Sequence, residues 1–348
     1  MPGNRHVTIA DVARTANVSR ALVSFVLNGR KDVAPATRTR ILQAIEELGY
    51  RPNAVARNLA TKRAGAIGIV CDMETYQDPL DMQFLAAILT TASELERRVM
   101  LIPADDRQIQ EVAQDHAVDG IIFLDERVSD PRIAHLLAMG IPAIGLWGDY
   151  LDATLRAGIE ELALHLESRG LQHIACLYES FDKLFVSKFK QVLTDTLQEY
   201  DITTTDLTHD ESGSYPNTEA EVAQAVAHKL KRDGATAIVA SSDKLAINAI
   251  HALHSARLRV PDDCAVTGFG DVPAAQWVQP PLTTIRVPVR AMALWAVAQV
   301  FTEEGMDQEQ IQHNVAGLTY PPDRVPQGPS PLHAITLAPT RLIVRRSC

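Results

Sequence analysis

Apolar residues recur at helical spacing twice within the first thirty positions of the chain. One apolar face is formed by Ile9, Val12, Ala13 and Ala16, and the next by Leu22, Val23, Val26 and Leu27. Thr8 and Asp11 are placed to cap the first helix, and Ser19 is placed to cap the second. Asn17 tolerates the left-handed backbone that a sharp turn requires. The segment 8–28 therefore predicts two short helices joined by a tight turn, a helix-turn-helix.

A third amphipathic segment follows at 35–48. Its inward positions are expected to be Ile41, Leu42, Ile45 and Leu48, with Arg38 and Arg40 on the outer side. A break at 49–53 then leads into a short segment rich in Ala, Arg and Asn. Two amphipathic helices with a turn occur in many helical proteins, so 8–28 alone leaves ordinary helix packing open. The third helix and the arginines around it favour DNA binding.

From position 64 the pattern changes to an alternation of apolar strands with amphipathic helices. In the first half, strands are expected at Ala66–Asp72, Val99–Ile102, Gly120–Leu124 and Ala143–Leu146, and helices at Met82–Glu96, Gln108–His116 and Arg132–Met139. In the second half, helices are expected at Leu155–Arg169, Leu184–Glu199, Thr218–Arg232, Asp243–Ser255 and Val289–Phe301, and strands at Gln172–Tyr178, Ala237–Ala240 and Cys264–Thr267. Thr283–Arg286 is interpreted as a crossing segment, and closing strands are expected near His333–Leu337 and Leu342–Val344. This succession predicts two parallel, doubly wound units.

Charge is distributed unevenly along the chain. The 348 residues carry a net charge of −10, which taken alone argues against nucleic acid. Up to Ala64, however, eleven basic and four acidic residues give +7, so the remainder carries −17. A small basic unit on a large acidic one fits a protein whose N-terminus neutralises DNA phosphates. With 46% apolar residues the chain can bury two or three cores.

Several classes of chemistry have no signal in the sequence. Its cysteines, Cys71, Cys176, Cys264 and Cys348, form no Cys-x-x-Cys pair, and the first three lie in or beside apolar strands as free buried thiols do. No residue set has metal-ligand spacing, and no cofactor-binding or nucleophile motif is present, so no metal, cofactor or catalytic residue is expected. The N-terminus lacks an apolar signal region, and no run reaches about 18 apolar residues. This predicts a soluble cytoplasmic protein without membrane association, bound to the nucleoid when it holds DNA.

The motifs together resemble those of the lactose-repressor (LacI/GalR) family of bacterial transcription regulators. The N-terminal matches are T-I-x-D-V-A, the A-x-V-S turn, V-S-x-V-L-N, V-x-x-x-T-R and G-Y-x-P-N-x-x-A-R-x-L. Further matches are Gly158 with His165-Leu166, the run Arg257 to Asp263, Gly268-Phe269 with Asp271, Pro280 to Thr284, and Thr340 to Ser347. The resemblance covers essentially the whole chain. It implies an all-α helix-turn-helix headpiece plus an α/β core of two Rossmann-like, parallel-sheet subdomains of periplasmic-binding-protein type.

The same resemblance implies a division into domains. It places a helix-turn-helix DNA-binding domain at 1–50, a hinge at 51–64, and an effector-binding and dimerisation core at 65–348. Within the core, the N-subdomain is expected at about 65–152 and 287–318, and the C-subdomain at about 153–283 and 319–348. Because no leucine-heptad tail is seen, a homodimer is favoured over a tetramer.

The resemblance also assigns contacts with double-stranded operator DNA. They fall on Thr8, Ser19, Arg20, Ala21, Ser24, Phe25, Asn28, Thr37, Arg38, Asn53, Ala56, Arg57 and Leu59. Arg20 and Ala21 occupy the two positions that specify the operator, where Arg20 can bind a guanine bidentately; a phosphate contact or solvent is the alternative. Leu59 matches the hinge leucine that wedges between base steps; an ordinary linker leucine is the alternative.

Two headpiece positions depart from the family pattern. Leu22 stands where threonine is usual, and Phe25 stands where an arginine usually reads a guanine. Since phenylalanine cannot donate a hydrogen bond, we expect an operator that differs from the common half-site at that base step. The alternative for Phe25 is a place in the core of the headpiece.

A small-molecule effector, a sugar or another metabolite, is implied between the two subdomains. The residues aligned with its pocket are Asp72, Tyr76, Leu124, Trp147, Phe185, Asp243 and Trp277. Phe185 replaces a usual arginine, and Gly270 replaces the first aspartate of G-F-D-D. We therefore expect an atypical, aromatic-lined pocket with Asp243 and Asp72 as polar contacts. The alternatives are that Asp243 is only a charge at a helix N-terminus, or that the pocket has degenerated and ignores small molecules.

The sequence thus favours a DNA-binding transcriptional repressor whose operator affinity is modulated by an effector. Such coupling between two sites is worth a few kcal/mol. A solute-binding protein of the same core fold would need an export signal and no headpiece. An enzyme would need a nucleophile–base pair, and the eleven scattered histidines suggest none, so no enzymatic activity is expected.

Overall fold

The computed structural model describes most of the chain. The described residues are 7–27, 33–50, 64–71, 78–124, 126–148, 151–178, 183–207, 219–226, 234–301 and 339–348. They divide into two compact units, Met1–Ala64 and Gly65–Cys348.

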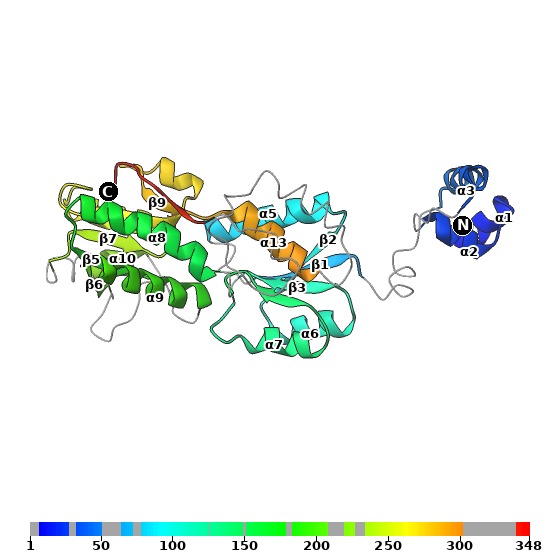
Figure 1. Ribbon diagram of the computed structural model, residues 1–348, viewed down its shortest axis with the longest axis horizontal. Helices are drawn as coiled ribbons and strands as arrows, with labels where there is room; N and C mark the ends of the chain where they lie inside the picture. Colours follow the sequence, from blue (N-terminus) through cyan, green and yellow to red (C-terminus); the bar gives the residue numbers. More distant parts are fainter. Residues whose placement is uncertain are drawn as a thin grey trace. The chain divides into compact units, whose positions relative to one another are not determined.

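The first unit contains three helices, α1 (Ile9–Thr15), α2 (Arg20–Leu27) and α3 (Pro35–Leu48) (Figure 1). At the start of α1, the Thr8 N–H donates to Asp11 Oδ2 at 3.0 Å. At the start of α2, Ser19 Oγ accepts from the Leu22 N–H at 3.2 Å. Asn17 has a φ of 50°, which is the left-handed conformation of the turn. Both caps and the turn expected from the sequence are therefore confirmed.

One stripe from each helix builds the core of this unit. Its buried members are Val12, Ala13, Ala16, Val23, Val26, Val33, Ile41 and Ala44. The prediction that Leu42 points inward is wrong, because its side chain is 52% exposed. Ile41 and Ala44 face the other two helices, and the next residue after Ile41 is turned about 100° around the helix axis, out of the stripe.

A four-stranded sheet opens the second unit. Its strands are β1 (Ala66–Cys71), β2 (Arg98–Pro103), β3 (Gly120–Phe123) and β4 (Ala143–Gly145). The order is β2-β1-β3-β4, and all pairs are parallel. Helices α5 (Pro79–Glu94) and α13 (Val289–Val300) lie on one face, and α6 (Asp106–Gln114) and α7 (Pro131–Ala138) lie on the other (Figure 1). Strands β1 and β3 are buried between the helices, as strands of parallel sheets are, whereas the edge strand β2 is largely exposed.

A six-stranded sheet follows. Its strands are β5 (His173–Leu177), β6 (Thr203–Asp206), β7 (Ala237–Ala240), β8 (Ala265–Gly270), β9 (Thr283–Arg286) and β10 (Arg341–Ile343). The order is β10-β9-β8-β7-β5-β6, with only β10 antiparallel to its neighbour. Its helices are α8 (Leu151–Ser168), α9 (Leu184–Glu199), α10 (Glu219–Ala225), α12 (Asp243–Ser255) and the short 3₁₀ helix η3 (Pro273–Gln276). The fold class expected from the sequence is confirmed.

Two strands differ from the sequence prediction. Thr283–Arg286 is not a bare crossing segment but strand β9, since it pairs with β8 on one side and with β10 on the other. Strand β6 was not predicted, because its sequence Thr-Thr-Thr-Asp has no apolar alternation; it lies at the edge of the sheet, where polar residues are tolerated. The strand expected near His333–Leu337 lies outside the described residues.

A single hydrophobic cluster joins the two sheets. It includes Ile67 and Ile69 of β1 as well as Ile174 and Cys176 of β5. In the described part of the chain, no helix has both the length and the apolar character needed to span a membrane.

Candidate DNA interface and effector cleft

Helix α2 presents one face to solvent and one to the core of the headpiece. Val23 and Val26 are buried, whereas Arg20 and Ala21 are exposed. Phe25 is 38% exposed and is not a member of the headpiece core, which weighs against the alternative that it is a core residue. A surface formed by an arginine, a small residue and an aromatic ring can reach base edges without moving buried groups.

The other predicted DNA contacts are distributed around this face. Thr8 and Ser19 lie at the N-termini of α1 and α2, where helix ends suit phosphate contacts. Ser24 of α2 and Thr37 and Arg38 of α3 are half-exposed. Asn28, Asn53, Ala56, Arg57 and Leu59 lie outside the described residues.

Aromatic rings fill the space between the two sheets of the second unit. Trp147, which follows β4, lies 5.2 Å from Phe84 of α5 and 4.6 Å from Phe185 of α9, measured between ring centroids. Phe269 of β8 lies 5.0 Å from Phe185 and 6.4 Å from Trp147. Tilted and edge-to-face contacts at these separations are favourable aromatic geometry. The predicted pocket residues Trp147 and Phe185 are thus brought together, but they contact each other.

Trp147 is also held by a buried carboxylate that the sequence did not single out. Glu126, on the segment after β3, accepts a hydrogen bond from the Trp147 N–H at Oε1, at 2.7 Å. The Glu126 carbonyl oxygen accepts from the Leu184 N–H at the start of α9, at 3.0 Å. The segment after β3 therefore links the backbone of Trp147 to the start of α9.

The remaining predicted pocket residues are dispersed. Leu124 is fully buried in the hydrophobic cluster and offers no surface to a ligand. Trp277 follows η3 and is 76% exposed, outside the aromatic cluster of Trp147, Phe185 and Phe269. Asp72 and Tyr76 lie outside the described residues.

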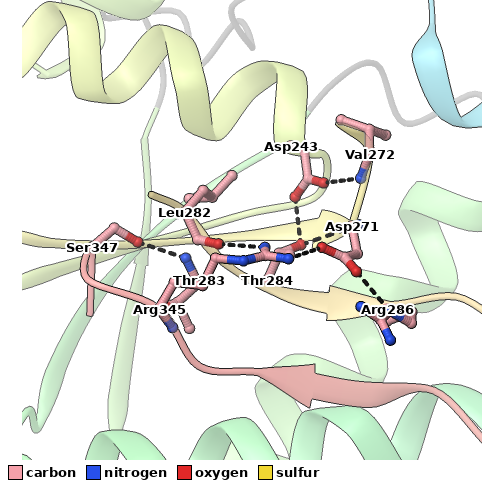
Figure 2. A network of polar contacts seen from close by, with 9 residues as sticks. All are labelled: Asp243, Asp271, Val272, Leu282, Thr283, Thr284, Arg286, Arg345 and Ser347. Atoms are coloured by element: carbon pink, nitrogen blue, oxygen red, sulfur yellow. Dashed lines mark hydrogen bonds and ion pairs between the residues drawn. The ribbon is translucent and has the colours of Figure 1, made fainter. Parts of the chain in front are cut away.

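Asp243, the expected polar contact, is already engaged inside the protein. Its carboxylate accepts hydrogen bonds from the Thr284 hydroxyl at Oδ1 and from the Val272 N–H at Oδ2, the latter at 2.8 Å (Figure 2). Only 1% of the residue is exposed, and this burial raises the pKa of Asp243 to about 6. The expectation that Asp243 binds the effector is therefore not supported; it connects α12 to β8 and β9.

Two glycines next to Asp243 are explained by this arrangement. A Cβ at Gly268 would collide with Oδ1 of Asp243. Gly270 has a φ of 127°, which residues with side chains rarely adopt. The replacement of the family's aspartate by Gly270 thus accompanies an unusual backbone at the end of β8.

Asp271 lies at the centre of a second set of contacts. Arg345 donates from its guanidinium to Oδ1, and Arg286 donates through Nε to Oδ2, each at 2.6 Å (Figure 2). Arg345 also donates to the carbonyl oxygen of Leu282 at 2.8 Å. Two guanidinium groups therefore share one carboxylate. One of them, that of Arg345, belongs to the C-terminal segment.

The C-terminal segment 339–348 is fastened along its length to the six-stranded sheet. Thr340 Oγ1 accepts from the Gly158 N–H of α8 at 3.1 Å. Ser347 Oγ donates to the carbonyl oxygen of Val266 at 2.6 Å and accepts from the Thr283 N–H at 2.8 Å. These contacts hold Arg345 in position against Asp271.

A groove of about 340 Å³ lies beside this network. Its walls come from α5, the end of β8 and the crossing from β9 to α13, and they are formed by Gln83, Gly270, Asp271, Arg286, Val287, Pro288, Val289, Arg290 and Ala291. None of these residues was predicted as a ligand contact. Asp271 stands in a family motif, which is the one sequence signal that pointed here. Among the described residues, no three His, Cys, Asp or Glu side chains gather as metal ligands do.

Two family models match the chain. One, for the DNA-binding segment, is described as bacterial regulatory proteins of the lacI family and matches residues 8–53. The other is described as a periplasmic binding protein-like domain and matches residues 163–321.

Relatives of known name match over most of their length. The HTH-type transcriptional regulator AscG of Escherichia coli (strain K12) is 30% identical over 320 residues, covering 86% of this chain and 93% of that protein. Catabolite control protein A of Priestia megaterium is 29% identical over 337 residues, covering 88% of this chain and 96% of that protein.

A solved structure of the lac repressor dimer, bound to operator and the anti-inducer ONPF, has the same fold. It matches with a TM-score of 0.74 at 23% identity and covers 99% of both chains. At this identity the likeness concerns the fold.

Proposed function

The chain belongs to the LacI family of bacterial regulatory proteins and is a DNA-binding transcriptional regulator; we propose that it is a repressor. Its affinity for operator DNA would change when a small molecule binds between its core subdomains. The observation that carries the proposal is the exposed face of α2. There Arg20, Ala21 and Phe25 face outward from a well-packed headpiece, and residues 1–64, the headpiece with the hinge, carry a net charge of +7. A basic unit with an exposed recognition face is what sequence-specific DNA binding requires.

We propose the domain limits derived from the sequence. The headpiece spans 1–50, the hinge 51–64 and the core 65–348, and the contacts with DNA are those assigned there. Thr8, Ser19, Ser24, Thr37 and Arg38 would bind the phosphate backbone, while Arg20 and Phe25 would face base edges. A protein with this task works in the cytoplasm, at the nucleoid.

A homodimer is part of the proposal. Leu89 of α5 and Met100 and Leu101 of β2 are exposed large apolar residues on one subdomain, and β2 is an edge of its sheet. An exposed apolar strip along a sheet edge suits pairing with a second copy. The lac repressor structure is that of a dimer. Sedimentation tests this. We expect the full chain to sediment as a dimer and the Leu101→Glu variant to sediment as a monomer.

The aromatic filling of the cleft favours a second candidate. Trp147, Phe185 and Phe269 occupy the interior between the sheets, and the Asp243 carboxylate is engaged internally. A regulator of the same family that binds its operator without responding to any small molecule would have such a cleft. The groove beside Asp271 favours the effector-dependent form, because it still offers polar groups to a ligand.

Operator selection followed by titration separates the two candidates. The full chain selects its sites from random duplex DNA, and fluorescence anisotropy then measures its affinity for them with and without cellular metabolites. The effector-dependent form is expected to change affinity about 5- to 150-fold with at least one metabolite fraction. Constant affinity across all fractions favours the second candidate, and the absence of selected sites contradicts both.

A further inference from the structure

The groove beside Asp271 contains a polar donor without an acceptor. Gln83 of α5 lines the groove, and its Nε2 is buried with no hydrogen-bond partner among the described residues. A buried amide left in this way costs free energy, so such groups are normally paired with protein, water or ligand. The missing partner of Gln83 is an acceptor.

The charges around the groove point in the same direction. Arg286 and Arg345 share the single carboxylate of Asp271, so these contacts leave one positive charge without a counterpart. Arg286 uses its Nε–H for Asp271, while a guanidinium has five N–H donors in all. Arg290 is the second arginine of the wall, and its ion pair with Glu94 is long, at 3.6 Å. The groove therefore has donors in excess of acceptors.

The backbone adds to this excess. Helix α13 begins at the groove, where Pro288, Val289, Arg290 and Ala291 form part of the wall. Its N-cap residue Pro288 supplies no side-chain hydrogen bond, and its first turn has no acidic residue. The positive end of the helix dipole is thus without the usual compensating side chain.

From the unpaired amide, the two arginines and the uncapped helix, we propose that this groove binds a small organic anion through a carboxylate or phosphoryl group. The inference rests on the proposed function and specifies its effector. Gln83 and Arg290 would donate to the anion directly, and Arg286 would do so with the N–H groups that Asp271 leaves over. Since Gln83 belongs to α5 and Arg286 to β9 of the six-stranded sheet, the anion would contact both subdomains, as a ligand that controls their closure must.

The test uses inorganic phosphate and succinate as probes of the two anion types, at constant ionic strength balanced with chloride. The melting temperature of the full chain is followed as either anion is raised to tens of millimolar. The variants are Arg290→Gln, which removes the positive charge, and Gln83→Met, which removes the amide donor and nearly keeps the side-chain volume. Arg107→Gln is the matched control, since Arg107 is an exposed arginine of α6 that pairs with Glu111 one helical turn further on and does not line the groove.

We expect a saturable rise of about 2 °C or more with at least one anion for the unaltered chain and Arg107→Gln, reduced by at least half in both groove variants. The more effective anion identifies the type of group bound. An equal rise in all four proteins overturns the proposal, because anions bound only to the headpiece would produce the same result. The absence of a rise with both anions also overturns it. Operator affinity of the same samples without anion reports separately on the proposed function.

Discussion

The rings of Trp147 and Phe185 lie with their centroids 4.6 Å apart, although Trp147 follows a strand of the four-stranded sheet and Phe185 opens a helix of the six-stranded one. A tilted aromatic pair of this kind contributes about 0.5–1.5 kcal/mol beyond the burial of its surface. Coupling between an effector and DNA is typically about 1–3 kcal/mol. The contact is therefore comparable in free energy to the coupling that the proposed effector would exert.

Removal of the Trp147 ring should destabilise the core. We expect Trp147→Ala to lower the free energy of unfolding by about 3 to 5 kcal/mol, because it empties a buried site among Phe84, Phe185 and Phe269. Trp277→Ala, at a largely exposed tryptophan, is the matched control and should stay within about 0.5 kcal/mol. Urea unfolding of the core measures both. Equal losses for the two variants would show that the ring is not a packing element.

The buried carboxylate of Asp243 should make stability depend on pH. Burial raises its pKa to about 6, against about 4 in the unfolded chain. Between about pH 4 and pH 6 the folded protein holds a proton that the unfolded chain has released, so the free energy of unfolding falls as the pH rises through this range. The loss is at most about 3 kcal/mol and levels off above pH 6.

Asp243→Asn tests this directly. The amide can accept from the Val272 N–H and donate to the Thr284 hydroxyl oxygen, and it does not titrate. Urea unfolding at a series of pH values should show the decline between pH 4 and pH 6 in the unaltered chain and a smaller decline in the variant. Parallel pH profiles would exclude Asp243 as the titrating group.

The C-terminal segment should stabilise the protein through the ion pair of Arg345 rather than through its positive charge in general. Arg345→Met leaves Asp271, which is 4% exposed at its side chain, with Arg286 as its remaining arginine. We expect a loss of about 3 kcal/mol, the lower end for a broken buried ion pair, because Arg286 still pairs with Asp271. Arg346→Met, at the exposed neighbouring arginine, should change stability by less than about 0.5 kcal/mol. Indistinguishable denaturation midpoints for the two variants would contradict the role given to Arg345.

Arg20 should determine operator sequence. If it binds a guanine, Arg20→Ala weakens operator binding by about 1 to 3 kcal/mol and relaxes selection at one base pair of each half-site. Arg14, which lies on α1 and pairs with Asp11 at 3.2 Å, is the control within the same headpiece. Arg14→Ala should weaken binding little and evenly across sequences. Selection experiments on the two variants measure the difference; an unchanged consensus in Arg20→Ala would assign Arg20 to phosphate or solvent.

Local structure was predictable where local chemistry determines it. The caps at Thr8 and Ser19 and the turn at Asn17 follow from side chains that bond to their own backbone within a few residues. Most core strands followed from short apolar runs. Strand β6 did not, because a polar edge strand carries no such signal.

The contents of the cleft were predictable only in part. The sequence indicated an aromatic lining through Trp147 and Phe185, but it did not indicate that these rings contact each other. The pairing of Arg345 with Asp271 and of Asp243 with Thr284 joins residues far apart in the chain. Such pairings depend on which strands become neighbours, and no local pattern encodes that.

The salt dependence of operator binding, measured on the full chain and on a chain lacking Met1–Ala64, tests the central claim most directly. We predict tight binding to a selected operator, a steep linear fall of log affinity with log salt concentration as several phosphate contacts are lost, and no binding once the headpiece and hinge are removed. Operator affinity that is insensitive to salt, or that survives removal of the headpiece, would contradict it.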